Sequence, residues 1–194
     1  QHCYFGGPIG HVIQDGDQLL ALDTCGVLES TIPRITHPTD TLANVVVLTS
    51  SGSYAAWEPR TITSTGGHYQ LCWCAHLQLC SQTEHSRTDL GMVTVIGPAP
   101  LQQMRTCISG QTCACGDLTG VRLANDDSIL VLDTCIGAGD EALTLPRFPS
   151  DARSVEARSS GSSQWTYGLA VTARGGQYRL CWCGTQLPAD DALF

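Results

Sequence analysis

The sequence contains no lysine, no N-x-S/T acceptor for N-linked glycans, and no aliphatic run longer than four residues, such as Val45-Val46-Val47-Leu48. All ten basic residues are arginines, scattered along a 194-residue chain that also holds 18 acidic residues. Because nucleic acids bind clustered cations, we expect no nucleic-acid partner. A helix that crosses a bilayer needs about 20 apolar residues, so we expect no membrane span in this chain.

Charged residues make up only 14% of the chain and hydrophobic residues 42%, which is typical of a folded protein. The sequence holds eleven cysteines, a density that is rare in reducing compartments. We therefore expect an extracellular, cell-surface or secretory-organelle location. The chain opens at Gln1-His2-Cys3 without a signal sequence, which we interpret as the result of processing or of a fragment boundary.

The two halves of the sequence match each other. At an offset of 110 positions, Cys3 falls on Cys113, and Leu22-Asp23-Thr24-Cys25 falls on Leu132-Asp133-Thr134-Cys135. At an offset of 109, residues 66–74 (GGHYQLCWC) fall on residues 175–183 (GGQYRLCWC), with seven of nine positions identical. This pattern indicates an internal duplication.

Residues 90–96 (LGMVTVI) predict a strand, and Gly97-Pro98-Ala99-Pro100 predicts a linker after it. We place a first module at residues 1–97 and a second at 98–194. With this period the first module lacks its opening segment and the second its final strand. We therefore expect this chain to be part of a longer array of modules, in which adjacent modules complete each other by donating a strand. The alternative is two complete domains with degenerate ends and one free thiol.

Short segments rich in β-branched and aromatic residues predict strands, and no stretch keeps a helical apolar period. The fold class we expect is all-β: two tandem disulfide-stapled Ig-like β-sandwich modules, with helix limited to a turn or two. In the strand that ends in C-W-C, alternation places Tyr69, Leu71 and Trp73 on one face and Cys72 and Cys74 on the other. This is the pattern of a central strand with both faces covered.

Closely spaced cysteines such as the two C-W-C pairs can be redox centres or metal ligands. Side chains two positions apart in a strand are about 6.5 to 7 Å apart, too far for a disulfide, so each cysteine should bond to a different partner. We therefore predict structural bridges. The candidates are Cys3, Cys25, Cys72, Cys74, Cys107, Cys113, Cys115, Cys135, Cys181 and Cys183.

The pairing is predicted from the correspondence between the copies. We expect these connections: Cys3 and Cys25 to the first C-W-C strand, Cys113 and Cys135 to the second, and Cys107 to Cys115. Cys80 has no cysteine counterpart in the second copy, so we expect it to be unpaired or bonded outside this chain. Spacing alone leaves 15 connectivities open for the six cysteines of the second copy.

All the histidines lie in the first copy, and we interpret them as solvated loop or strand-end residues, with a transition-metal pair at His68 and His76 as the alternative. They are His2, His11, His37, His68, His76 and His85.

Acidic residues precede the Leu-rich strand in both copies, as Asp15-Gly16-Asp17 and Asn125-Asp126-Asp127. They favour a tight turn, with a Ca²⁺ site as the alternative. Asp23 and Asp133, at the end of this strand, predict partly buried carboxylates that accept backbone hydrogen bonds.

No nucleophile–base arrangement, HExxH motif or phosphate-binding glycine loop is present, so we expect neither an enzyme nor a cofactor. The function we expect is that of a structural or adhesive repeat module in a filament, stalk or ectodomain. Its partners would be neighbouring modules and other surface or extracellular proteins. The alternatives are a carbohydrate- or ligand-binding module that uses Trp57 and Trp165, and a metal-dependent enzyme.

Three features carry a resemblance to a known family: the G-G-x-Y-x-L-C-W-C strand, the C-x5-C spacing of Cys107 and Cys113, and the strand that ends in Gly-Pro. Together they resemble the cysteine-rich tandem repeats of large secreted and surface proteins of alveolates, namely the apicomplexan cysteine repeat modular proteins and similar dinoflagellate proteins. The resemblance covers both copies. It implies a multi-module ectodomain at the cell surface or in a secretory organelle, and it supplies no active site.

Overall fold

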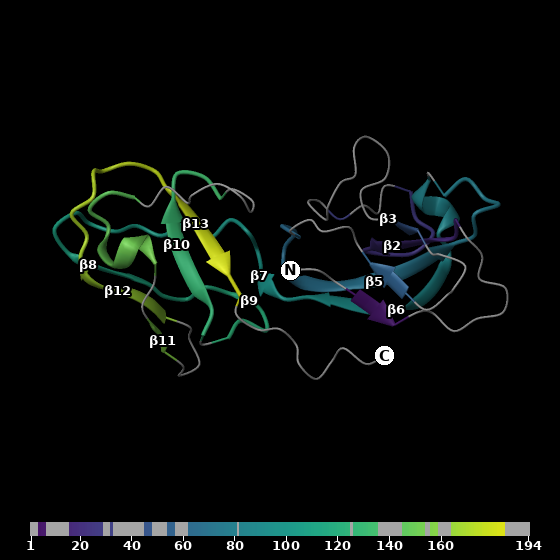
Figure 1. The fold of residues 1–194 in the computed structure, drawn as a ribbon, viewed down its shortest axis with the longest axis horizontal. Helices are drawn as coiled ribbons and strands as arrows, with labels where there is room; N and C mark the ends of the chain where they lie inside the picture. The colour runs from purple at the N-terminus through teal and green to yellow at the C-terminus, as the bar shows by residue number, and fades with distance from the viewer. Residues whose placement is uncertain are drawn as a thin grey trace. The chain divides into compact units, whose positions relative to one another are not determined.

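The computed structural model describes residues 4–6, 16–28, 32, 45–47, 54–56, 62–80, 82–124, 126–135, 145–153, 156–158 and 164–184. In these residues the only helices are two short 3-10 segments, η1 (Thr83–His85) and η2 (Pro149–Ala152), and the other regular elements are strands (Figure 1). The prediction of an all-β fold is confirmed. The chain divides into two compact units, which consist mainly of residues 1–95 (unit 1) and 96–187 (unit 2).

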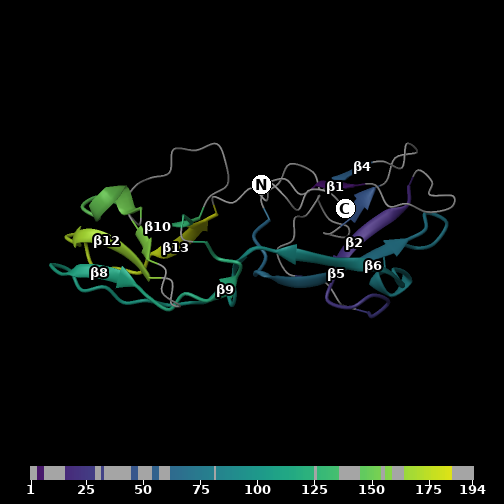
Figure 2. The same ribbon diagram turned by 90° about the horizontal axis from the view of Figure 1, so that it is seen from below.

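Unit 1 is built on a four-stranded antiparallel sheet. In spatial order its strands are β3 (Val45–Val47), β2 (Gln18–Leu22), β5 (Gly67–Cys74) and β6 (Thr88–Val95). A separate antiparallel pair consists of β1 (Tyr4–Gly6) and β4 (Tyr54–Ala56), and Figure 2 shows this pair in a layer of its own. The C-W-C strand β5 is therefore central in its sheet, as its alternation predicts.

Strand β2 is buried on both faces of the unit 1 sheet, and its side chains are apolar at successive positions. Leu19 and Ala21 lie on one face and pack in a cluster with Tyr69 of β5. Leu20 and Leu22 lie on the opposite face and pack with Cys72. Successive side chains of a strand point to opposite faces of its sheet. When all of them are apolar, they can all be buried only if both faces are covered.

The described residues of unit 2 form three groups of strands. They are the three-stranded sheet β11 (Glu156–Arg158), β12 (Gln164–Ala170) and β8 (Thr112–Cys115), the pair β10 (Ser128–Leu132) and β13 (Arg179–Cys183), and the pair β7 (Gly97–Pro98) and β9 (Gly120–Val121). Gly97 and Pro98, expected as part of a linker, therefore form a paired strand. Gly120 allows this pairing, since a Cβ there would lie 2.4 Å from the carbonyl oxygen of Gly97.

The core of unit 2 draws on both larger groups of strands. Cys115 of β8, Ile129 of β10 and Tyr167 of β12 belong to one buried cluster. Phe148 meets the Tyr167 ring edge-to-face, with the ring centroids 4.9 Å apart. This cluster accounts for the burial of Tyr167, which has no exposed surface.

One strand pair occurs in both units with the same register. In unit 1, β2 pairs with β5 so that Leu19 faces Trp73, and in unit 2, β10 pairs with β13 so that Ile129 faces Trp182. All five pairs of the second ladder follow from the first by adding 110 to the β2 residue and 109 to the β5 residue. The sequence match between the copies is thus also a match of backbone pairing.

Candidate functional site

Two long-range disulfides occupy corresponding places in the two units. Cys25 bonds to Cys72 and Cys135 bonds to Cys181, each with a Cα–Cα distance of 5.6 Å. Each bridge ties the segment after the first strand of the repeated pair to the first cysteine of C-W-C. The correspondence between the copies predicts a bond from Cys25 and from Cys135 to these strands.

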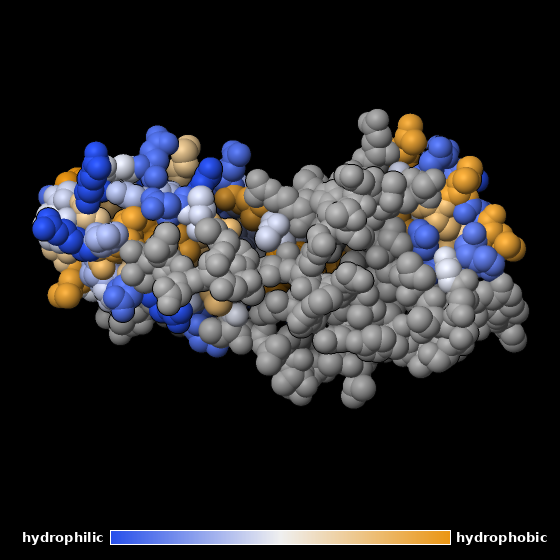
Figure 3. Space-filling view, turned by 45° about the horizontal axis from the view of Figure 1, so that its top comes forward, coloured by the Kyte–Doolittle hydropathy of each residue, from blue (hydrophilic) through white to orange (hydrophobic). Residues whose placement is uncertain are grey.

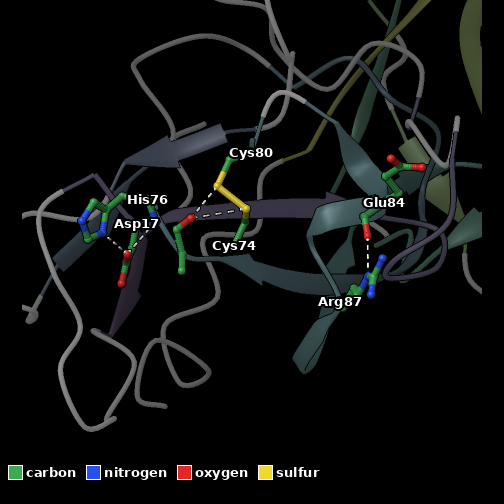
Figure 4. The surroundings of a disulfide bond; sticks show 7 residues. Asp17, Cys74, His76, Cys80, Glu84 and Arg87 are labelled. Atoms are coloured by element: carbon green, nitrogen blue, oxygen red, sulfur yellow. Dashed lines mark hydrogen bonds and ion pairs between the residues drawn. A yellow bond between two sulfur atoms is a disulfide. The ribbon is translucent and has the colours of Figure 1, made fainter. Parts of the chain in front are cut away.

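Two further bridges differ from the predicted pairing. Cys80, expected to be unpaired or bonded outside this chain, bonds to Cys74 (Figure 4). Cys107 bonds to Cys113. The predictions that Cys107 pairs with Cys115 and that Cys113 bonds to the C-W-C strand are therefore wrong.

A common spacing explains these two corrections. Both bridges join cysteines with a sequence separation of 6. Matching one copy against the other cannot find such local loops, because neither has its counterpart in the other copy. The C-x5-C spacing, present once in each copy, is the signal that could have predicted both.

Two of the candidate cysteines are free thiols in the structure, Cys115 and Cys183. Cys115 is buried beside Tyr167, and burial raises the pKa of its thiol, although Tyr167 and Arg105 act in the opposite direction. Since the thiolate is the reactive form, a thiol with a raised pKa is a poor nucleophile at neutral pH. Cys183 is exposed, and Cys3 lies outside the described residues.

A buried carboxylate precedes the repeated strand pair in both units. Asp17 is 2% exposed, and its Oδ1 accepts a hydrogen bond from the backbone N–H of His76 and lies 3.0 Å from the His76 Nδ1 (Figure 4). The corresponding Asp127 is 5% exposed, and its Oδ2 accepts from the backbone N–H of Ala124 and from the indole N–H of Trp182. Each carboxylate thus joins the turn before the strand to the C-W-C strand or to the residues just after it.

These carboxylates correct one expectation from the sequence. Asp23 and Asp133, expected to be partly buried, are exposed. Asp17 and Asp127, expected as turn residues, are the buried ones. Hydrophobic context alone could not distinguish them, because both positions adjoin the same apolar strand. Asp15 and Asn125 lie outside the described residues.

The G-G-x-Y part of the motif forms the same local contact in both units. The Tyr69 hydroxyl donates to the Thr65 carbonyl oxygen at 2.8 Å. The Tyr178 hydroxyl donates to the Arg174 carbonyl oxygen at 2.6 Å. Each ring folds back over the glycine two positions before it, so that a Cβ on Gly67 or Gly176 would lie 3.0 or 3.1 Å from ring or hydroxyl atoms. The motif therefore holds the start of the C-W-C strand in place.

The described histidines do not form a metal site. His68 at the start of β5 contacts Thr94, His76 after its end contacts Asp17, and His85 lies 3.4 Å from Glu84. The strand between His68 and His76 spans about 20 Å, so these two side chains cannot share one ion. No group of three or more metal-ligating side chains occurs among the described residues. The other histidines, His2, His11 and His37, lie outside them.

The described residues do not show the two tryptophans of the predicted carbohydrate site, Trp57 and Trp165, together in one binding site. Trp57 lies outside the described residues, and the backbone of Trp165 pairs with Cys115 and Ala157 within the three-stranded sheet. The ligand-binding alternative therefore stays a prediction. Trp73 and Trp182 are half-buried in the C-W-C strands.

On the face drawn in Figure 3, apolar and hydrophilic side chains alternate over the described part of the surface. Exposed apolar residues in unit 1 include Leu77 at 85% and Leu79 at 65%, both within the loop closed by the Cys74–Cys80 bridge. No helix among the described residues is long and apolar enough to cross a membrane. No family model, curated protein or solved structure matches this chain.

Proposed function

We propose that this chain is a non-enzymatic structural or adhesive part of a larger extracellular or surface protein, built from tandem modules of one repeat. The observation that carries the proposal is the recurrence of one disulfide-stapled strand pair, β2–β5 and β10–β13, in the same register. Structural modules are commonly multiplied along a chain, because each copy adds length and surface without new chemistry.

Three kinds of contact recur together and support the repeat architecture. They are the bridge to the first cysteine of C-W-C, the buried carboxylate before the strand pair, and the tyrosine folded over its glycine. All three hold backbone segments in place. A β-sandwich is the arrangement we propose for each module, since the core of unit 2 lies against strands of two sheets.

The four disulfides among the described residues support an oxidising location, because such bridges are rare in reducing compartments. Each long bridge is expected to stabilise its unit by about 2 to 4 kcal/mol through restriction of the unfolded chain. Modules of this kind suit a protein that must keep its shape without cellular repair. The resemblance to alveolate surface repeats is part of this proposal and rests on the C-W-C strand.

Single-molecule extension from the two chain ends tests the proposed mechanical role. The bridges Cys25–Cys72 and Cys135–Cys181 close segments with sequence separations of 47 and 46. Each should withhold about 160 Å of chain from extension until it is reduced. We expect reduction of these two long bridges to add two nearly equal increments. In the Cys72→Ser or the Cys181→Ser variant, one of these increments should appear without reductant.

Equal contour lengths before and after reduction would show that the bridges do not limit extension, and the mechanical role would then fail. A glycan array provides the opposing test. Binding that disappears on Trp57→Ala or Trp165→Ala would replace the structural function with ligand binding.

A further inference from the structure

The two C-W-C strands differ in what lies along their second edge. β5 pairs with β2 on one side and with β6 on the other. β13 pairs with β10 in the register of the β2–β5 pair, and no strand among the described residues pairs with its other edge (Figure 1).

β13 is more exposed than β5. Cys72 and Cys74 of β5 are 0% and 1% exposed. Their counterparts in β13 are Cys181, which is half-buried, and Cys183, which is exposed. Among the described residues, nothing gives β13 the cover that β6 and the loop before it give to β5.

β13 also lacks the features that prevent sheet edges from pairing. Its sequence, R-L-C-W-C, contains no proline and only one charge, at Arg179, and its ladder with β10 runs without a bulge. β6, at the edge of unit 1, has an irregularity in its ladder near Gly91, whose φ is 123°, and a charge at Asp89. A flat apolar edge is a template for a further strand, whereas bulges and charges discourage one.

We propose that the open edge of β13 binds a strand of the β6 type from another module of the same repeat, antiparallel and in the register that β6 keeps with β5. The inference rests on the proposed repeat architecture. In unit 1, Val93 faces Tyr69 and Thr88 faces Trp73. The bound strand would place the corresponding residues opposite Tyr178 and Trp182. Main-chain hydrogen bonds supply the affinity in this mode of binding, and alternate side chains supply the specificity.

The charges on the edge fit this occupant. In unit 1, when the side-chain amide of Gln70 is turned so that its NH2 group faces the acceptors, it donates to both carboxylate oxygens of Asp89, at 3.1 Å. The residue of β13 that corresponds to Gln70 is Arg179, an exposed cation. A β6-type strand would therefore bring a carboxylate to Arg179, where an ion pair replaces the neutral hydrogen bond.

A synthetic peptide of residues 86–96 tests the proposal on the oxidised, full-length chain. Amide hydrogen exchange should slow in residues 179–183 by about tenfold when the peptide is present at ten times its dissociation constant. Residues 67–74 serve as the internal control, since their edge is already paired with β6 and their exchange should not change. Of two peptides N-methylated at alternate positions, only one should lose binding, because a strand pairs through one set of amides.

A substitution cycle tests the predicted ion pair. Asp89→Asn in the peptide should weaken binding about twofold to fivefold. The same change should have no effect when the protein carries Arg179→Gln, while the unsubstituted peptide still protects residues 179–183.

Three outcomes would overturn the inference. They are no protection of residues 179–183, protection already present in the free monomer, and protection in a dimer whose two β13 edges pair with each other. If mass spectrometry shows that the Cys25–Cys72 and Cys135–Cys181 bridges are intact, none of these outcomes contradicts the proposed function. Loss of those bridges from the native protein would remove the proposed function itself.

Discussion

At the scale of single residues, Tyr69 and Tyr178 give the repeat its most local contact, a hydroxyl bonded to a carbonyl four positions earlier. We predict that Tyr69→Phe and Tyr178→Phe each lower the free energy of unfolding by about 1 kcal/mol, because each removes one hydrogen bond and leaves the ring in place. Denaturant unfolding followed by tryptophan fluorescence measures both.

The preceding glycines supply the control for this prediction. Gly67→Ala and Gly176→Ala add a methyl group within 3.0 to 3.1 Å of tyrosine ring or hydroxyl atoms, so each should cost more than the matching Tyr→Phe change. Alanine variants as stable as the wild type would mean that the rings do not fold over these glycines.

Tyr167 predicts a loss of stability at high pH. Burial, together with the neighbouring Cys115, raises the pKa of its hydroxyl above the ordinary value of 10.0. Above that pH the unfolded chain releases this proton while the folded chain keeps it, so the free energy of unfolding falls as the pH rises. The loss approaches about 1.4 kcal/mol per pH unit for this one group.

Comparison with Tyr167→Phe isolates the contribution of this group. Below pH 9 the stability difference between the two proteins should be constant, and above pH 10 it should shift in favour of the variant. Parallel stability curves across this range would show that the hydroxyl is not buried in the folded protein.

At the scale of elements, the buried carboxylates hold the strand pair to its neighbouring turn. Asp127 accepts from the Ala124 backbone and from the Trp182 indole, so Asp127→Ala leaves two donors without this partner. We predict a loss of about 3 kcal/mol in the free energy of unfolding. The exposed neighbour provides a matched control, since Asp126→Ala should change it by less than about 0.5 kcal/mol.

A similar small effect of both substitutions would contradict the proposed role of Asp127. The corresponding change in unit 1, Asp17→Ala, should be as severe as Asp127→Ala. It removes the acceptor for the His76 backbone N–H.

The strands themselves could largely be predicted, because their signal is local. Alternation in β5 predicts which side chains share a face, and the clusters around Tyr69 and Cys72 confirm it. β7 could not be predicted, since Gly97 and Pro98 have the composition of a linker. Their pairing depends on Gly120, about 20 positions further along the chain, which sequence periodicity does not register.

At the scale of the whole molecule, the duplication in the sequence carries most of the information. It aligns Cys25 with Cys135 and Cys72 with Cys181, the four residues of the two long bridges. It could not predict the partner of Cys80, which has no counterpart, or separate Asp17 from Asp23 by burial. Those outcomes depend on loop closure and on hydrogen bonds between segments, which a match of one copy against the other does not register.

The central claim is that two corresponding disulfides staple two copies of one β-module. Non-reducing peptide mapping of native material by mass spectrometry, with free thiols alkylated beforehand, tests it most directly. We predict cross-linked peptides joining Cys25 to Cys72 and Cys135 to Cys181, and alkylation at Cys183. Alkylation of those four cysteines in most of the molecules, or their retention as ligands of a bound metal, would contradict the account.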